Sequence, residues 1–273
     1  MNHYILRYGE IALKGKNRGH FENRLAGNIN IYVKSRYDTD SSVTKIRGRL
    51  VLATDADVDL RPIFGLVSYS KAVKVEKEIE AIKQIALEEF AKISTSQTFR
   101  VETHRLDKSF PMKSPEISRD VGEGIYEKYK TEVDFKNPDA VLGVEIHNKT
   151  AFIYTETVRC FGGLPLGSSE KILVPLKNNR SILTALNLMR RGCLITFVGD
   201  KKELSLIKLF NNYKDPVIIK EYEALNEEIK AYASPNEISN LDKDKDFLML
   251  YPIALLSDKE VEEDLKKYEE IQK

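Results

Sequence analysis

The sequence has no tryptophan, only two cysteines and no long apolar run, and each absence excludes a class of protein. The cysteines, Cys160 and Cys193, are too few for a disulfide framework, and neither they nor the histidines have the spacing of a metal site. No stretch of about 18 apolar residues could cross a membrane, and the chain opens without a signal-peptide pattern. We therefore expect a cytoplasmic globular protein that contacts no membrane and holds no metal.

Core-forming residues are plentiful, since 42% of the 273 residues are hydrophobic. That share is too high for wholesale disorder, and the length suggests two domains or three small ones. The formal net charge of +1 alone argues against a nucleic-acid binder. However, residues 1–75 hold 13 Lys and Arg against 7 Asp and Glu, whereas the rest of the chain is mildly acidic. This asymmetry indicates a polyanionic partner for the basic segment, with ordinary scatter of solvated charges as the alternative.

The apolar pattern predicts three units, at residues 1–75, 76–167 and 168–273. The first has the β-α-β-β-α-β order of a ferredoxin-like domain. We expect its strands at 4–8, 43–49, 50–53 and 68–75, with the hairpin turning near Arg47-Gly48-Arg49, and its helices at 21–36 and 57–64. The second unit is expected to have helices at 79–93 and 118–130 and strands at 98–104, 140–146 and 149–156.

Strands and helices alternate in the third unit, which favours a Rossmann-like parallel sheet. We expect strands at 172–176, 194–198, 217–219 and 247–250, and helices at 181–191, 203–213, 222–232 and 259–271. Residues 242–246 read as a charged loop. The whole chain is therefore predicted to be of the α/β class, with α+β units at its N-terminus.

Three groups of residues are suited to binding RNA. The first is a basic, glycine-containing loop with the hairpin that follows it, namely Lys14, Lys16, Arg18, Arg24, Arg47 and Arg49. The second surrounds the strand at 98–104 and includes Arg100, Arg105, Lys108 and Lys113. The third is the loop of Arg159, Gly162 and Gly163, which could bind an anion through backbone amides or act as a hinge.

Two further side chains of the second group could stack on an unpaired base, namely His104 and Phe110. The simpler interpretation is a hydrogen-bonded structural histidine and a phenylalanine of the core.

Together these stretches resemble the tRNA 4-thiouridine synthetase family, also called the thiamine-biosynthesis sulfurtransferases. The run Arg7-Tyr8-Gly9-Glu10-Ile11 with Lys14-Gly15 is similar to the start of that family, and residues 105–114 and 159–167 are similar to its THUMP domain, an RNA-binding module. The resemblance covers residues 1–167. It implies a ferredoxin-like domain followed by THUMP, which together cradle a tRNA through its acceptor end.

The third unit departs from this family at its nucleotide site. The resemblance implies a PP-loop domain, in which a strand runs into Ser-Gly-Gly-x-Asp-Ser and glycine amides at a helix N-terminus hold ATP phosphate. Here the stretch reads Lys177-Asn178-Asn179-Arg180-Ser181, without the two glycines and the aspartate. Lys177 and Arg180 could still attract an anion. We expect a preserved scaffold whose loop does not bind ATP in the ordinary way.

The sequence also lacks the residues for the sulfur chemistry that the resemblance implies. The family carries its persulfide on cysteines late in the PP-loop domain or in an appended rhodanese domain, and no cysteine follows Cys193 in this sequence. Cys160 and Cys193 are interpreted as structural. The carboxylates at 262–264 and 269–270 read as a solvated helix face rather than an acid–base pair.

Three functions stay open, and with them the question of whether the chain is an enzyme. The leading hypothesis is tRNA binding by a relative of the tRNA sulfurtransferases that lacks its own ATP-dependent adenylation and presents tRNA to a separate modifying enzyme. The second is an active tRNA sulfurtransferase of tRNA thiolation or thiamine biosynthesis, for which ATP would be the cofactor. The third is a structural or regulatory homo-oligomer, for example a homodimer.

Overall fold

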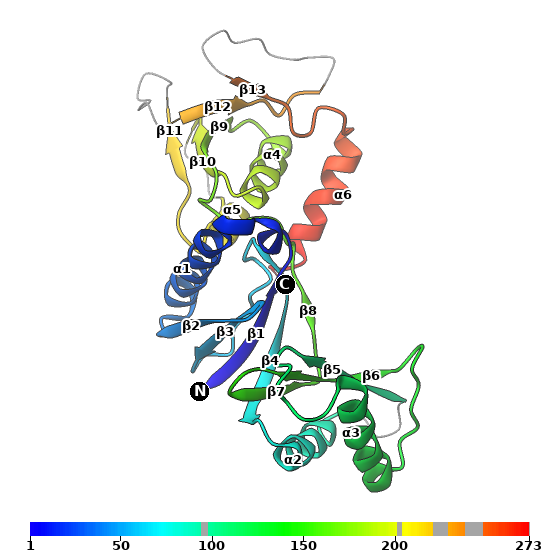
Figure 1. Ribbon diagram of the computed structural model, residues 1–273. Coiled ribbons are helices and arrows are strands. Elements are labelled where there is room, and N and C mark those ends of the chain that lie inside the picture. Colours follow the sequence, from blue (N-terminus) through cyan, green and yellow to red (C-terminus); the bar gives the residue numbers. More distant parts are fainter. Residues whose placement is uncertain (94–97, 201–203, 221–228, 238–247, 273) are drawn as a thin grey trace. The chain divides into compact units, whose positions relative to one another are not determined.

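The computed structural model describes residues 1–93, 98–200, 204–220, 229–237 and 248–272 (Figure 1). Its elements fall into two compact units whose segments alternate along the chain. The first consists of Met1–Arg7, Ser41–Asp57 and Ser68–Arg159, and the second of Tyr8–Asp40, Val58–Val67 and Cys160–Lys273. The division into domains at 75 and 167 stays a prediction.

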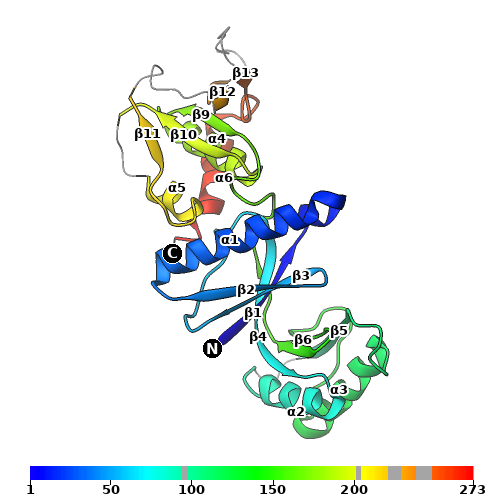
Figure 2. The same cartoon turned by 60° about the vertical axis from the view of Figure 1, so that its left-hand side comes forward.

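The sheet of the first unit has the order β2-β3-β1-β4-β7-β6-β5, and β8 pairs with β4. Its strands are β1 (Asn2–Tyr8), β2 (Ser41–Ile46), β3 (Arg49–Thr54), β4 (Leu66–Glu76), β5 (Phe99–Arg105), β6 (Ala140–Ile146), β7 (Thr150–Tyr154) and β8 (Val158–Arg159). β2 and β3 form the predicted hairpin, and Gly48 supplies the positive φ that its turn requires (Figure 2). β5 pairs with β6 in parallel, whereas β1 with β3, β2 with β3, β4 with β7 and β8, and β6 with β7 pair antiparallel.

Two helices cover one face of β5, β6 and β7, namely α2 (Ile79–Phe90) and α3 (Ser114–Tyr129) (Figure 1). Residues at i and i+4 share a helix face, and this spacing places Ile117, Val121 and Ile125 of α3 in the core. Ile82 and Phe90 of α2 join the same cluster. The helices predicted at 79–93 and 118–130 are therefore confirmed, although α3 begins four residues earlier than expected.

The second unit contains a fully parallel sheet with the order β11-β10-β9-β12-β13. Its strands are β9 (Lys171–Pro175), β10 (Leu194–Val198), β11 (Val217–Ile219), β12 (Ile229–Ala233) and β13 (Leu248–Leu250). Counted from β9, this is the 3-2-1-4-5 arrangement of a Rossmann-like sheet, whose order reverses between β9 and β12. The predicted parallel sheet is confirmed.

The helices of the second unit are α1 (Arg18–Tyr37), α4 (Asn179–Arg190), α5 (Ser205–Phe210) and α6 (Asp258–Glu269), with the 3-10 turns η1 (Glu10–Leu13) and η2 (Gly15–Asn17). The helix predicted at 21–36 is confirmed as part of α1, in which Leu25, Ile29 and Val33 are fully buried. None of the helices in the described part of the chain has the length and apolarity needed to cross a membrane.

Two predicted helices were wrong. Residues 57–60 have no regular structure, and turns follow at 61–65. There the amides of Ile63 and Leu66 each bond to the carbonyl three residues earlier, and the proline at 62 has no amide hydrogen to donate. The C-terminal part of the helix expected at 222–232 is strand β12, because it pairs with β9 and β13 on both sides. Residues 221–228 and the loop at 242–246 lie outside the described residues.

α5 is also shorter than the predicted 203–213, of which residue 203 is not described. Asn212 and Tyr213 have φ values of 53° and 59°, and this left-handed backbone cannot continue a right-handed helix.

Candidate nucleic-acid interface and the loop after β9

Arg49, one of the predicted RNA-binding residues, is bound by a buried carboxylate in the first unit. Glu145 of β6 is completely buried, and its Oε2 lies 3.1 Å from Nε of Arg49, while Arg7 donates from Nε and Nη2 to Oε1 at 3.0 and 2.8 Å. Burial opposes ionisation of Glu145, but the nearby His147, whose Nε2 lies 3.5 Å from Oε2, and the charges of both arginines outweigh it and lower the pKa to about 2. Arg49 therefore has a structural partner that sequence reasoning missed.

Arg105 closes the loop that follows β5. Its Nη1 donates to the carbonyls of Phe110 and Met112, both at 3.1 Å. Lys77 ion-pairs with Asp107 at 2.8 Å, and this hydrogen bond, together with those from Ser109, lowers the pKa of the carboxyl. The conformation of this loop therefore depends on Arg105 itself.

The two predicted stacking side chains differ in their exposure. Phe110 is 5% exposed and packs in the core with α2 and α3, so it cannot stack on a base, and the core interpretation is correct. The His104 side chain is 43% exposed and lies 3.3 Å from Glu102. Arg100 donates to the Phe135 carbonyl at 3.0 Å and is 3.4 Å from Glu102.

Four other predicted cations of the first unit are exposed, and none of them has an ion pair within the described ranges: Arg47, Lys108, Lys113 and Arg159. Arg47 and Lys108 each lie two residues along the chain from a residue that contacts the C-terminal end of β6. Arg49 binds Glu145, and the amide of Leu106 bonds to the carbonyl of Ile146 at 2.9 Å. Tertiary structure therefore brings these two exposed cations to one end of the sheet.

The cations of the basic loop belong to the second unit. Arg18 pairs with Glu22 at 2.8 Å, and Lys14 lies over the Phe21 ring at 5.0 Å. Lys16 and Arg24 are exposed and form no ion pair with any residue that the structure describes. In both units, some of the predicted cations bind partners within the protein and others are exposed.

The glycine loop has structural roles that account for its composition. The amide of Gly162 bonds to the carbonyl of Leu66 at 2.7 Å, and the amide of Leu164 bonds to the carbonyl of Arg190 at 2.9 Å. Gly163 has a φ of 82°, and a Cβ there would lie 2.1 Å from the Arg190 carbonyl oxygen. Because the chain packs this closely, no larger residue fits at Gly163. Anion binding by this loop stays a prediction.

The loop after β9 satisfies its own amides. Asn178 caps α4, and its Oδ1 accepts the amide of Arg180 at 3.1 Å, while Oγ of the buried Ser181 accepts the amide of Lys177 at 3.0 Å. Such amides at a helix N-terminus are the groups that bind phosphate when they point at a ligand. Here side chains of the loop itself, rather than a ligand, accept amide hydrogens.

The guanidinium of Arg180 occupies the point where the sheet order reverses. Arg180 is 8% exposed, and it donates to the carbonyls of Pro235 at 2.8 Å, Ile253 at 3.1 Å and Leu256 at 3.0 Å. It also pairs with Asp258 at 3.0 Å. Pro235 follows β12, and in open α/β sheets this crevice beyond the strand ends is the usual ligand site. The loop therefore has amides bound by its own side chains and an arginine paired with Asp258, rather than the open glycine amides that the resemblance implies.

Neither cysteine has the environment of a nucleophile. Burial raises the pKa of Cys160 to about 12 and also raises that of Cys193, so little thiolate forms near neutrality. No group of three metal-ligating side chains comes together in the described part of the chain.

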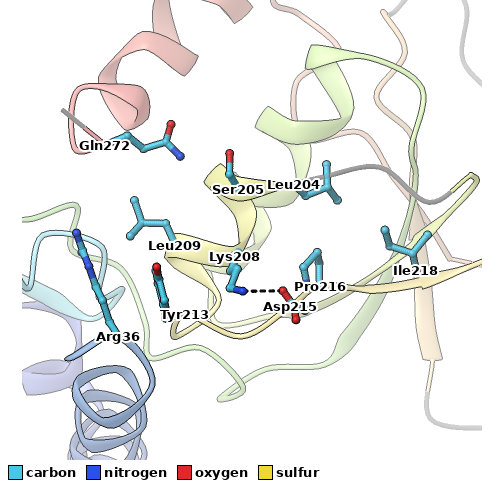
Figure 3. Close-up of a pocket in the computed structure, with 10 residues that line it drawn as sticks. All are labelled: Arg36, Leu204, Ser205, Lys208, Leu209, Tyr213, Asp215, Pro216, Ile218 and Gln272. Carbon is cyan, nitrogen blue, oxygen red and sulfur yellow. Dashed lines mark ion pairs between the residues drawn. The ribbon is translucent and has the colours of Figure 1, made fainter. Parts of the chain in front are cut away.

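A cavity of about 910 Å³ lies in the second unit, away from the loop after β9 (Figure 3). Its lining consists of Arg36, Leu204, Ser205, Lys208, Leu209, Tyr213, Asp215, Pro216, Ile218 and Gln272. Lys208 is neutralised by Asp215 at 2.9 Å, and Arg36 lies beside the rings of Tyr32, Tyr37 and Tyr213. No motif of the sequence pointed to this cavity, since its lining comes from separate segments.

Two protein-family models match parts of the chain. Residues 3–70 match the ThiI ferredoxin-like domain, and residues 76–156 match the THUMP domain. The predicted ferredoxin-like and THUMP folds are therefore confirmed.

Curated relatives are named "Probable tRNA sulfurtransferase". The protein of Thermoanaerobacter sp. (strain X514) is 38% identical over 195 residues, which are 69% of this chain and 50% of the relative. The protein of Staphylococcus aureus (strain Newman) is 36% identical over 226 residues, with coverage of 76% and 55%. That of Thermococcus kodakarensis is 35% identical over 228 residues, with coverage of 78% and 60%. The chain thus spans about half the length of the curated relatives it matches.

Solved structures agree with the fold. PH1313 from Pyrococcus horikoshii Ot3 matches with a TM-score of 0.86 and 27% identity, covering 98% of this chain and 99% of that one. A 4-thiouridine synthetase, solved as an RNA complex with bound ATP, matches with a TM-score of 0.78 and 24% identity, covering 98% of this chain and 85% of that one. The predicted Rossmann-like third part is confirmed by these matches together with the parallel sheet.

Proposed function

We propose that this chain, which shares the ThiI ferredoxin-like and THUMP domains of the tRNA sulfurtransferases, binds tRNA but does not adenylate it. The observation that carries the proposal is the loop after β9. Asn178 accepts the amide of Arg180 in α4, Ser181 accepts the amide of Lys177 in the loop, and the buried Arg180 fills the crevice where a nucleotide would bind. The acceptor end of the tRNA, a separate modifying enzyme as recipient and a cytoplasmic location stay part of this proposal.

Exposed cations support the tRNA-binding half of the proposal. Arg47 and Lys108 lie at one end of the first sheet without ion pairs among the described residues, so their charges are free to neutralise phosphates. Each phosphate contact releases counterions, which makes affinity fall with salt. Arg49 and Arg105, by contrast, would affect binding mainly through the positions of the turn and the loop, because their guanidinium groups bind Glu145 and two backbone carbonyls.

The binding experiment titrates a fluorescent tRNA transcript with the full chain over a series of salt concentrations. We expect affinity to fall steeply with salt, and the Arg47→Ala/Lys108→Ala double variant to bind more weakly, with a salt slope lower by about 2. Lys266→Ala on α6 is the matched control, since Lys266 is equally exposed and lies outside the predicted groups. Absent or salt-independent binding would contradict the proposal.

The active-enzyme alternative is supported by the relatives, which are named as probable tRNA sulfurtransferases, so it needs its own measurement. The purified chain is incubated with tRNA and ATP labelled in the α-phosphate, and the tRNA is then examined for bound AMP. We expect no labelled tRNA and no heat of ATP binding in calorimetry. Labelled tRNA would establish the alternative, while intact tRNA binding without label supports a binding protein.

A further inference from the structure

The outer edge of β5 offers backbone groups for a further strand. β5 is the last strand in the order of the first sheet, with β6 as its neighbour on one side. The carbonyl of Thr98 accepts the amide of Ala140 at 3.0 Å, so the even-numbered residues of β5 direct their backbone groups toward β6. Those of Val101 and Thr103 therefore point outward, and they form no hydrogen bond within the part of the chain that the structure describes.

The chain itself already pairs with the first position of this edge. The amide of Phe99 bonds to the carbonyl of Glu132, and the amide of Asp134 bonds to the carbonyl of Phe99, both at 3.0 Å, so that Val133 pairs with Phe99 in parallel. The Oδ1 of Asp134 then accepts the amides two and three residues later, at 2.7 and 3.0 Å, which bends the chain away. Pairing therefore stops before Val101, and the edge beyond it is open to another extended segment.

A groove of about 830 Å³ lies beside this open edge, between β5 and α3. Val101 lines it, and three exposed apolar side chains stand around it, with Phe135 75% exposed, Tyr126 51% and Val133 43%. Large apolar side chains gathered on one surface mark a site of association. None of the predicted RNA-binding residues lines this groove.

A glycine of α3 leaves room for side chains of an added strand. The Val101 and Thr103 side chains face α3, where Oγ1 of Thr103 accepts a hydrogen bond from Ser118 at 2.8 Å. Alternate side chains of a strand added beside β5 would lie on this same face, over Gly122. A Cβ on Gly122 would meet only Val101, at an ordinary contact distance of 3.9 Å. Internal packing therefore does not require glycine there, although glycine weakens a helix relative to alanine.

The charges of the groove favour a basic occupant. Glu123 and Glu132 line it and are exposed, and neither forms an ion pair with any residue that the structure describes. Within the described lining, Arg119 is the one opposing cation. Carboxylates in excess attract lysine and arginine and repel the phosphates of an RNA backbone.

We propose that β5 accepts an extended segment of a partner protein as an added strand, in which apolar side chains at alternate positions are flanked by lysine or arginine. Its main chain pairs with the outward groups of Val101 and Thr103, and its apolar side chains enter the groove over Gly122. In this mode of recognition, main-chain hydrogen bonds supply affinity and the groove selects the side chains. The flanking cations lie near Glu123 and Glu132. This site is separate from the cations proposed to bind tRNA.

A labelled peptide, Lys-Lys-Val-Thr-Val-Thr-Val-Lys-Lys, is the probe, and fluorescence anisotropy measures its binding to the full chain. We expect saturable binding below about 1 mM. Methylation of the amides of its valine and threonine residues keeps every side chain but removes the backbone donors, and replacement of its lysines by glutamates reverses the charge. Each change should weaken binding about tenfold or more.

Two pairs of variants test the edge and the groove separately. Thr103→Pro removes an outward amide hydrogen without touching the ladder to β6, and proline is tolerated at such edge positions. It should weaken peptide binding about tenfold or more, whereas Thr103→Val keeps the amide and should bind like the wild type. Gly122→Leu fills the groove and should have the same effect as the proline. Gly124→Leu is its control, because Gly124 does not line the groove and a Cβ there meets no atom within 4 Å.

Several outcomes would overturn the proposal. They are absent binding, binding that survives both amide methylation and Thr103→Pro, and displacement of the peptide by tRNA, which would assign the groove to RNA. A dimer in sedimentation that Thr103→Pro dissociates would assign the edge to a second copy and also overturn it. Peptide binding without tRNA binding would count only against the proposed function, and tRNA binding without peptide binding only against this site.

Discussion

Replacing Glu145 with glutamine tests the buried carboxylate that positions Arg7 and Arg49. Glutamine keeps the shape of the side chain but cannot carry the negative charge that both guanidinium groups bind. The environment lowers the pKa of Glu145 from its ordinary 4.5 to about 2. At about 1.4 kcal/mol per pKa unit, the ionised form is worth about 3 kcal/mol more to the folded protein than a neutral one. We expect the Glu145→Gln variant to lose about that free energy of unfolding at pH 7.

The pH dependence of this difference identifies its cause. Because the folded protein has the lower pKa, the stabilisation is complete above about pH 5 and disappears as the pH falls from 4.5 toward 2. Urea denaturation of wild type and variant at several pH values measures it. The two free energies of unfolding should differ by about 3 kcal/mol near neutrality and converge at low pH.

Glu102→Gln is the control, since Glu102 is on the neighbouring strand but exposed, and it should change the free energy of unfolding by less than about 1 kcal/mol. A loss at Glu145 that is equally small, or one that does not vary with pH, would refute the assignment of a charged, paired Glu145.

Three other substitutions test the packing described above. Arg180→Ala leaves the carbonyls of Pro235 and Ile253 without their donor and should cost about 3 kcal/mol in urea denaturation; calorimetry should show no gain of ATP binding, as the loop still lacks glycines. Gly163→Ala should lower the free energy of unfolding by at least about 1–2 kcal/mol, because its Cβ meets the Arg190 carbonyl and its φ is left-handed. Phe110→Ala should lower the free energy of unfolding by about 3–5 kcal/mol, while the folded fraction still binds tRNA normally. Weaker tRNA binding by that folded fraction would instead indicate that Phe110 stacks on a base.

Much of the secondary structure could be predicted, because local periodicity reflects which face of an element is buried. The strand at 194–198 and the apolar face of α1 are examples. The errors fall where tertiary contacts override local preference. Residues 229–233 resemble the end of a helix in sequence, yet they form a strand because β9 and β13 supply hydrogen-bonding partners on both sides.

The missing glycines of residues 177–181 were evident from the sequence alone, since an amide cradle for phosphate depends on residue identity at fixed positions. The sequence likewise determined which side chains carry positive charge. Only the tertiary structure decided which of them are free, because an arginine's partner can be far along the chain. Arg49 binds a carboxylate 96 residues away, and Arg180 binds carbonyls 55 and 73 residues away. Local sequence contains no signal for such contacts, which exist only once the sheets have formed.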